Sequence, residues 1–243
     1  MKNLDKFILI TGSEGQIGLS VTKLLSNKNF NLILIDKKNL NKKNYYKIDL
    51  SNSKNLNKAL KKIKKKHKKI DVLINLAAVQ VFSDFEKRSE KDIDEMINVN
   101  LKSNILLSKF IFKEYFKGQK SGKIINISSI FGLKSPNFKN YDRGDRKSSE
   151  TYGATKAAII QLTKYFANYM SEYNVSVNCI SPGGVENQKT QTKKFIKRYS
   201  KNVPVGRMAK AEEISQLIYF LLSEKSGYIN GQNIIIDGGI TAK

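Results

Sequence analysis

The chain has 243 residues, 40% of them hydrophobic and 27% charged, which fits one globular domain that buries a core without disulfide or metal. Its 44 Lys and Arg residues outnumber 21 Asp and Glu residues, so the formal net charge is +23 at pH 7. The chain has one cysteine, Cys179, and one histidine, His67, which lies in a lysine run where we expect solvated surroundings. A single cysteine excludes an intramolecular disulfide, and one cysteine with one histidine excludes a zinc site. A solvated histidine also excludes a Ser-His-Asp triad, which needs a buried imidazole.

The first apolar run, Phe7–Ile10, is too short for the core of a signal peptide, and no run reaches the roughly 18 apolar residues of a membrane span. We therefore expect a cytoplasmic protein with no membrane partner. Similar runs follow along the chain, and their nearly continuous apolar character is typical of strands covered on both faces. Strands are expected at Phe7–Ile10, Leu32–Ile35, Val72–Ile74, Lys123–Ile127, Val175–Ile180 and Asn233–Ile236, with a weaker one at Tyr45–Ile48.

Longer segments with helical patterns separate these strands. Helices are expected at Ile17–Asn27, Ser53–Lys69, Lys91–Tyr115, Tyr152–Tyr173 and Ala211–Ser223. Strand–helix alternation at this spacing indicates βαβ units, whose right-handed crossovers produce a parallel sheet. We predict a single α/β domain over residues 1–243, with a doubly wound Rossmann-type sheet of about seven strands and helices on both faces.

The segment Lys54–Lys69 carries much of the excess charge. Leu56, Leu60 and Ile63 recur in it at helical spacing, so one stripe is expected to pack on the sheet while the lysines face water. The alternative is a nucleic-acid surface, which this segment suits poorly because it lacks interleaved aromatic residues. Only five of the chain's 44 basic residues are arginine, and we expect no specific nucleic-acid partner.

A glycine-rich turn follows the first strand and opens the first helix. Glycines in this setting allow a tight turn and close approach of the backbone to a pyrophosphate, which meets the N-terminal end of the helix. Asp36 ends the second strand 18 residues after Gly18, where a carboxylate accepts both hydroxyls of an adenosine ribose. This predicts NAD, although Lys37 and Lys38 leave NADP possible, and an ordinary strand–helix turn is the alternative. The expected dinucleotide contacts here are Gly12, Ser13, Gly15, Gln16, Ile17, Gly18 and Asp36.

Tyr152 and Lys156 are four residues apart and so lie on one face of a predicted helix. A nearby ammonium and an oxidised nicotinamide ring both favour the phenolate, so we expect the pKa of Tyr152 to be lowered. Tyr152 would then exchange a proton with a substrate oxygen while hydride moves between carbon and nicotinamide. The alternative, two surface residues at this spacing, is less consistent with Ser128 and Ser129, which end a neighbouring strand.

Ordered motifs along almost the whole chain resemble the short-chain dehydrogenase/reductase family in its short, single-domain type. The matching pieces, in order, are the glycine turn, Asp49-Leu50, Asn75-Leu-Ala-Ala78, Asn98-Val-Asn100, Ser128-Ser129, Tyr152 with Lys156, Pro182-Gly183, Pro204 with Arg207, Asn230-Gly-Gln232 and Asp237-Gly-Gly239. The resemblance implies an NAD(P)-dependent oxidoreductase that acts on a hydroxyl or ketone of a small-molecule substrate.

The resemblance also implies roles for individual residues. Tyr152 matches the acid/base, Lys156 the residue that lowers its pKa and holds the nicotinamide ribose, and Ser129 the hydroxyl that orients the substrate oxygen, with Ser128 as the fallback. Asn100 matches the asparagine of a proton relay near Lys156. The remaining cofactor contacts implied by the resemblance are Asp49, Leu50, Asn75, Ala77, Pro182, Gly183 and Val185, whereas Arg207 matches a structural motif.

Three departures from the family pattern are local. The glycine spacing is more typical of the extended, nucleotide-sugar branch, but the chain ends soon after Asp237-Gly-Gly239, which favours the short type. Asn75-Leu-Ala-Ala78 replaces the usual Asn-Asn-Ala-Gly and is expected to alter packing rather than chemistry. Asn187 stands where a threonine commonly follows the Pro-Gly turn, so no threonine contact is expected there.

The largest departure is an insertion at residues 133–151, because Ser129 and Tyr152 are 23 residues apart, more than the family's usual interval. It contains Arg143 and Arg146, whose guanidinium groups suit carboxylate and phosphate oxygens and so point to an anionic substrate. Exposed loop charges are the alternative. Residues 186–202 lie where such enzymes place a mobile lid, with an ordinary surface helix as the alternative.

The insertion and two later segments resemble a subgroup linked to flagellin modification and nonulosonic-acid biosynthesis. The expected substrate is therefore a sugar or sugar-derived acid of surface-glycan biosynthesis. The alternatives are a 3-oxoacyl-(acyl-carrier-protein) reductase-like enzyme, a non-catalytic protein that senses NAD, and a nucleic-acid binder. The resemblance also implies a homo-oligomer, a tetramer or dimer, formed through the long helices at Lys91–Tyr115 and Tyr152–Tyr173.

Overall fold

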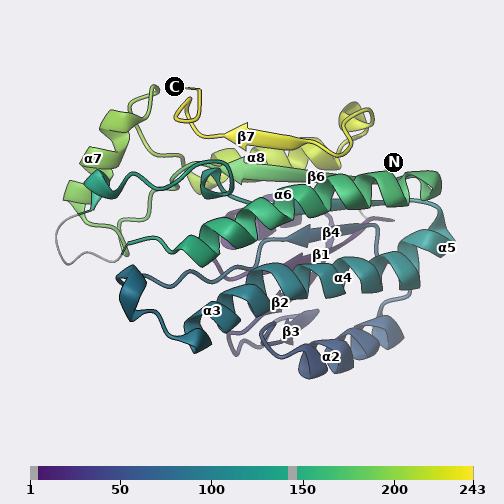
Figure 1. Cartoon of the computed structure of the whole chain (residues 1–243). Helices are drawn as coiled ribbons and strands as arrows, with labels where there is room; N and C mark the ends of the chain where they lie inside the picture. The colour runs from purple at the N-terminus through teal and green to yellow at the C-terminus, as the bar shows by residue number, and fades with distance from the viewer. Residues whose placement is uncertain (1–4, 142–146, 243) are drawn as a thin grey trace.

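A seven-stranded parallel sheet forms the centre of the protein, whose computed structural model describes residues 5–141 and 147–242 (Figure 1). The strand order is β3-β2-β1-β4-β5-β6-β7, and each neighbouring pair is parallel. The strands are β1 (Phe7–Thr11), β2 (Asn31–Asp36), β3 (Tyr45–Lys47), β4 (Val72–Asn75), β5 (Gly122–Ile127), β6 (Val175–Pro182) and β7 (Asn233–Ile236). The predicted doubly wound sheet is confirmed, including the weak third strand.

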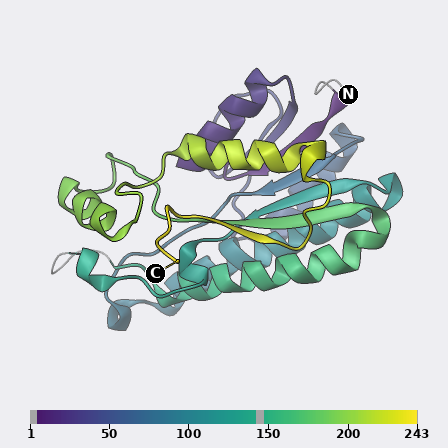
Figure 2. The same ribbon diagram turned by 90° about the horizontal axis from the view of Figure 1, so that it is seen from above.

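The sheet is covered on both faces, which is why its strands are apolar at nearly every position. On β1, Leu9 faces one core while Ile8 and Ile10 face the other. Helices α2 (Ser53–Lys66), α4 (Ser103–Ile111) and α6 (Glu150–Met170) contribute to the first core, and helices α1 (Gln16–Asn27) and α8 (Ala211–Leu222) contribute to the second. Figure 2 shows these two layers of helices on opposite sides of the sheet.

The predicted helix at Lys91–Tyr115 is longer in the structure and is not regular. It begins at Glu90, after the N-cap residue Ser89, whose side chain forms a reciprocal capping box with Asp92. The helices α3 (Glu90–Met96), α4 and α5 (Lys117–Gln119) are joined by π-helical segments at Ile97–Lys102 and Phe112–Phe116. A π-helical segment adds a residue to a turn and so changes which side chains face a neighbour. In none of the helices that the structure describes is there an apolar stretch long enough to cross a bilayer.

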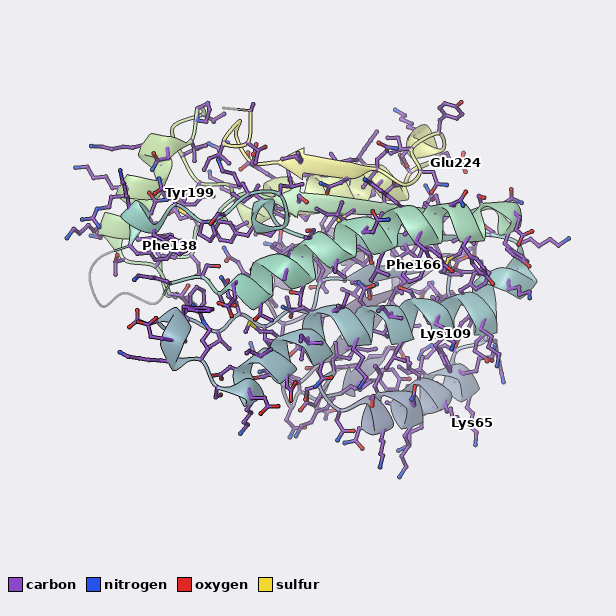
Figure 3. All side chains as sticks on the ribbon, in the orientation of Figure 1. Lys65, Lys109, Phe138, Phe166, Tyr199 and Glu224 are labelled. Carbon is purple, nitrogen blue, oxygen red and sulfur yellow. The ribbon has the colours of Figure 1, made fainter. Side chains whose placement is uncertain are left out.

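Helix α2 has the predicted amphipathic pattern, but the histidine after it does not lie where we expected. Leu56, Leu60 and Ile63 are buried, while Lys65 lies on the solvent side (Figure 3). His67 was expected to be solvated and is instead buried, with 7% of its surface exposed. The helix ends at Lys66, and the extended backbone of His67 turns the imidazole inward, where Nε2 lies 2.8 Å from the hydroxyl of Tyr46.

The carboxyl ends of all seven strands meet at one edge of the sheet, because the strands are parallel. Thr11, Asp36 and Asn75 end β1, β2 and β4 there, and Pro182 ends β6. Helix α7 (Lys193–Asn202) stands beyond this edge, at the left of Figure 1, and forms a small core of its own around Tyr199. The predicted site residues that end or follow these strands therefore lie along one edge of the sheet.

Candidate functional site

A cavity of about 570 Å³ opens at the carboxyl edge of the sheet. Predicted site residues from four separate parts of the chain line it: Gln16, Ile17, Ser129, Tyr152, Lys156, Pro182, Gly183 and Val185. Residues that sequence reasoning did not single out also line it: Leu76, Ala78, Gln80, Phe82, Ile127, Ile130, Phe131, Tyr141, Gly184, Thr190, Gln191, Thr192, Phe195, Tyr199 and Met208. Ser128, the fallback hydroxyl, is among the lining residues as well.

The glycine turn is shaped by close contacts between backbone atoms. Gly12 has φ +68°, a conformation that other residues rarely adopt, and a Cβ there would lie 2.7 Å from the Cα of Ala77. A Cβ on Gly18 would lie 2.1 Å from the carbonyl oxygen of Gly12. Glycine at these positions therefore lets α1 begin directly against the end of β1.

The start of α1 leaves polar groups available for an anion. Gly15 is the N-cap residue and supplies no side-chain cap, and the first turn carries no acidic residue. In contrast, a side-chain oxygen caps α2, α6 and α7. The Oγ of Ser13, in the same turn, is buried without a hydrogen-bond partner in the described part of the chain. Free N–H groups at a helix N-terminus and an unpaired hydroxyl fit the diphosphate of a dinucleotide.

Two acidic residues mark the expected adenosine end of this site. Asp36 ends β2, and its Oδ2 accepts a hydrogen bond from the backbone N–H of Glu14 at 3.0 Å, which places this carboxylate beside the glycine turn. Asp49 follows β3 and is exposed, and its Oδ1 accepts hydrogen bonds from the N–H and hydroxyl of Ser51. The next residue, Leu50, is buried.

Asn75 and Ala77 lie behind the glycine turn rather than in the lining of the cavity. The Nδ2 of Asn75 donates to the Oδ1 of Asn126 at 2.9 Å, and its Oδ1 is buried without a hydrogen-bond partner among the described residues. The N–H of Ala77 donates to the Oγ1 of Thr11 at 3.3 Å. The first contact ties the end of β4 to β5, and the second ties the chain after β4 to the end of β1, which supports the turn between β1 and α1.

Tyr152 and Ser129 meet at the cavity. The hydroxyl of Ser149 caps α6 by accepting from the N–H of Tyr152 at 3.0 Å, which fixes the tyrosine in the first turn. Burial raises the pKa of Tyr152 to about 12, while a hydrogen bond with the Ser129 side chain acts in the opposite direction. The expected lowering is therefore wrong for the protein alone, because burial of the phenol outweighs its polar neighbours. At neutral pH the Tyr152 hydroxyl carries its proton.

The two serines after β5 have different surroundings. The Oγ of Ser128 is buried and donates to the carbonyl oxygen of Lys156 at 2.7 Å, which fastens α6 to the end of β5. Ser129 is less buried, and its Oγ accepts from the N–H of Phe131 at 3.1 Å as well as bonding to Tyr152. The geometry favours Ser129 over Ser128 as the hydroxyl available to a substrate.

Lys156 is held one turn along α6 from Tyr152, with only 3% of its surface exposed. Its Nζ donates to the carbonyl oxygen of Ile127 at 2.8 Å and lies 5.5 Å from the centre of the Tyr152 ring. Burial lowers the pKa of Lys156 to about 8. An ammonium in this position costs folding free energy and is therefore more consistent with a binding or proton-transfer role than with stability.

This buried charge predicts a pH-dependent stability. Because the pKa of Lys156 falls from 10.5 to about 8 on folding, the unfolded chain binds more protons between these values, and stability rises with pH across that window. Near pH 7 we expect Lys156→Met to be more stable than wild type. This difference in the free energy of unfolding should shrink by roughly 3 kcal/mol by pH 10.5, because wild type becomes more stable over this range. Urea unfolding at several pH values measures this. The exposed-site control Lys65→Met should show no such trend, and a flat difference for Lys156→Met would contradict the expectation.

Asn100 lies in the π-helical segment Ile97–Lys102, and its side chain is fully engaged in local structure. Its Oδ1 accepts from the N–H of Val79 at 2.8 Å, and its Nδ2 donates to the carbonyl oxygen of Val79 at 2.9 Å and to the Oγ1 of Thr155 at 3.2 Å. These bonds hold the chain after β4 against α6. The side chain therefore positions the elements around Lys156, while contact with Lys156 itself stays a prediction.

The predicted insertion and the predicted lid meet above the cavity. The ring centres of Tyr141 and Phe195 lie 5.3 Å apart, and the Nδ2 of Asn202 donates to the Oδ1 of Asn140 at 2.8 Å. The N–H of Gly184 donates to the hydroxyl of Tyr199 at 2.7 Å, which joins α7 to the loop after β6. Tyr199 and Phe138 are labelled at the same end of the molecule in Figure 3. Arg143 and Arg146 lie outside the described residues.

Sequence reasoning predicted that the insertion and residues 186–202 lie at the substrate site, but it did not identify which of their side chains line the cavity. Phe195 and Tyr199 are four residues apart in a polar, lysine-rich segment, and this spacing is the signal that could have found them. Gln80 was missed because its environment comes from a distant contact, in which its Nε2 donates to the Oγ of Ser148 at 2.6 Å. No short motif connects these positions.

Known proteins that resemble this chain in sequence or structure include reductases, a dehydrogenase and a flagellin modification protein. The sequence model of a family described as enoyl-(acyl carrier protein) reductase matches residues 17–241. The chain is 31% identical to 3-oxoacyl-(acyl-carrier-protein) reductase FabG of Thermotoga maritima, over 99% of each chain. It is 32% identical to post-translational flagellin modification protein A of Campylobacter coli, over 97% of this chain and 98% of that protein. A short-chain dehydrogenase of Leptospira borgpetersenii, crystallised with NAD+, superposes with a TM-score of 0.90 at 35% identity, covering 98% of this chain and 93% of that chain.

Proposed function

The chain belongs to the short-chain dehydrogenase/reductase family and is an NAD(P)-dependent oxidoreductase, and on this premise we propose that its substrate is a sugar or sugar-derived acid of surface-glycan biosynthesis. The cavity that joins the glycine turn to Tyr152 carries the proposal, since it brings the expected cofactor and proton-transfer groups together. The similarity to a flagellin modification protein supports a substrate from surface-glycan biosynthesis.

The proposed chemistry divides the work between cofactor and protein. When bound, a nicotinamide cofactor held by the glycine turn and Asp36 would supply hydride transfer at the substrate carbon. Tyr152 exchanges a proton with the substrate oxygen, and Ser129 orients that oxygen through its hydroxyl. Because burial keeps the Tyr152 proton in place at neutral pH, the residue is set to donate it to a developing alkoxide. The Lys156 ammonium, 5.5 Å from the ring of Tyr152, stabilises negative charge on the phenol oxygen once the proton has left.

The wall of the cavity supports a polyhydroxylated substrate. Among its described residues, Lys156 is the one with a formal charge at neutral pH. The rest of the polar lining consists of amides and hydroxyls, including Gln80, Gln191 and Thr192, beside the aromatic rings of Tyr141 and Phe195. Amides and hydroxyls hydrogen-bond to sugar hydroxyls, and aromatic faces pack against sugar C–H groups. For a sugar-acid substrate, we propose that Arg143 and Arg146 of the protein bind the substrate carboxylate.

A 3-oxoacyl-(acyl-carrier-protein) reductase-like activity is the second candidate. The similarity to FabG over 99% of the chain favours it. Tyr141, Phe82 and Phe195 also offer apolar surface to an acyl chain. The alternative of a non-catalytic NAD sensor is not supported, because the chain belongs to a family of oxidoreductases. It also pairs Ser129 with Tyr152 beside a buried Lys156, whereas sensing needs no proton transfer.

We further propose that residues 186–202 act as a lid, that the chain forms a homo-oligomer and that it is cytoplasmic. The lid proposal is supported by Thr190, Gln191 and Phe195, which line the cavity. The oligomer proposal is supported by Tyr165 and Tyr169, which stack on the exposed face of α6 with ring centres 6.0 Å apart. Exposed aromatic residues on a long helix are typical of an interface.

The substrate proposal is tested by turnover with ketoses, polyols, sugar acids and 3-oxobutyryl thioesters. We expect the highest kcat/KM for a sugar or sugar acid. Phe195→Ala should raise the KM for that substrate about tenfold with unchanged NADH binding, because it removes an aromatic face from the cavity wall. A higher kcat/KM for the 3-oxobutyryl thioester than for every sugar would overturn the sugar proposal in favour of the second candidate.

A further inference from the structure

Two carboxylates and two ammonium groups converge where β2 ends beside the glycine turn. The Nζ of Lys42 pairs with the Oε1 of Glu14 at 2.8 Å, and the Nζ of Lys38 donates to the backbone carbonyl oxygen of Glu14 at 3.2 Å. Asp36 accepts from the N–H of Glu14 through Oδ2 and from the N–H of Lys38 through Oδ1. Glu14 is thus the common partner of both lysines and of Asp36.

The Glu14 carboxylate is well enclosed, although it belongs to a turn on the protein surface. Its side chain is 8% exposed, whereas the side chain of Lys42 is 46% exposed. Both Glu14 and Asp36 help to raise the pKa of Tyr45 to about 12, after the larger effect of burial, so both carboxylates lie near that hydroxyl. The Tyr45 hydroxyl in turn donates to the carbonyl oxygen of Lys38 at 2.9 Å, which fastens the loop that carries the lysines.

This cluster surrounds the expected position of the adenosine ribose. A carboxylate at the end of the second strand accepts the ribose hydroxyls of NAD, and a basic group nearby accommodates the 2′-phosphate of NADP. This chain carries both kinds of group, but the ion pair with Glu14 occupies the ammonium of Lys42. Within the hydrogen-bonded cluster the formal charges of Glu14, Asp36, Lys38 and Lys42 cancel, and the exposed Lys37 beside it adds one positive charge. The two carboxylates suit a neutral diol better than a dianionic phosphate.

We propose that Glu14 is a second residue that determines cofactor selectivity, because it holds Lys42 away from a 2′-phosphate. The proposal rests on the proposed placement of the cofactor and deepens it. Asp36 opposes a 2′-phosphate directly, whereas Glu14 acts by occupying the cation that would bind it. Removal of the Glu14 carboxylate leaves the cluster with a net positive charge and a free ammonium.

The test measures the affinities of two cofactor fragments, 2′,5′-ADP and 5′-AMP, by calorimetry at low salt. The ratio of the two affinities is then compared between wild type and variants. Glu14→Gln is expected to raise the affinity for 2′,5′-ADP relative to 5′-AMP about tenfold, which corresponds to about 1.4 kcal/mol. The gain should shrink at high salt, since the groups are partly exposed. The control Glu172→Gln removes the same charge from an exposed site far from β2 and should leave the ratio unchanged.

A second substitution identifies Lys42 as the group released. The double variant Glu14→Gln with Lys42→Met should lose the increase in the affinity ratio. Lys42→Met alone should lower the ratio below that of wild type. This single variant keeps the test available if Glu14→Gln does not fold. A ratio for folded Glu14→Gln within twofold of wild type, or a gain that survives in the double variant, would overturn the proposal. If wild type binds neither 5′-AMP nor NADH, the cofactor placement fails and this proposal fails with it.

Discussion

Replacement of Tyr152 by phenylalanine is expected to lower turnover by about 10²- to 10⁴-fold, the usual contribution of a positioned acid or base. The substitution removes one hydroxyl, which hydrogen-bonds to Ser129, and keeps the ring that packs in the first turn of α6. Binding of NADH should stay within a few-fold of wild type, because the glycine turn and the end of β2 are unchanged. Steady-state kinetics together with NADH fluorescence separate the two effects.

Tyr219→Phe is the matched control for this experiment. Tyr219 lies on α8, in the core on the opposite side of the sheet, and its ring packs edge-on against Phe30. Its variant should turn over at the wild-type rate. If Tyr152→Phe also kept the wild-type rate, Tyr152 would not be the acid or base, and the proposed chemistry would be wrong.

Replacement of Gly18 by alanine is expected to cost about 1–3 kcal/mol of stability or more and to abolish measurable cofactor binding. The new Cβ would lie 2.1 Å from the carbonyl oxygen of Gly12 and 2.8 Å from the carbonyl carbon of Ser13. Both are backbone atoms of the turn, so the turn must move away from the start of α1. Chemical denaturation and NADH titration measure the two losses.

Gly118→Ala supplies the control within the same protein. Gly118 lies in α5, and a Cβ there meets no atom within 4 Å. Alanine in a helix is more favourable than glycine by up to about 1 kcal/mol, so this variant should be as stable as wild type or slightly more stable. Equal stability and equal NADH affinity for Gly18→Ala and Gly118→Ala would contradict the tight packing at the glycine turn.

Much of the fold was predictable because a parallel sheet buries its strands on both faces. The apolar runs that contain Leu9 and Ile74 needed no long-range information to be recognised as strands. The π-helical segments were not predictable in this way, since one extra residue in a turn leaves the helical pattern nearly intact. His67 was misplaced because its burial depends on Tyr46, from a separate strand.

The site was predictable where a short motif carries the chemistry and not where separate loops meet. The glycine turn and the pair of Tyr152 with Lys156 each lie within a few residues of sequence, and the structure brings parts of both to one cavity. The expected lowering of the pKa of Tyr152 was wrong for the protein alone, because sequence shows the neighbouring cation but not how strongly the surrounding protein desolvates the phenol. The contact between Tyr141 and Phe195 joins two loops that no motif relates.

Transfer of deuterium from NADH labelled at C4 tests the central claim most directly. Wild type is incubated with the labelled cofactor and a panel of ketoses, keto acids and 3-oxoacyl thioesters, and the products are analysed by mass spectrometry. We expect one product to gain a single deuterium on the reduced carbon, and the Tyr152→Phe variant to form it at least about 100-fold more slowly. Tight binding of NADH and NADPH without label transfer to any member of the panel would contradict an oxidoreductase and indicate a protein that senses the cofactor.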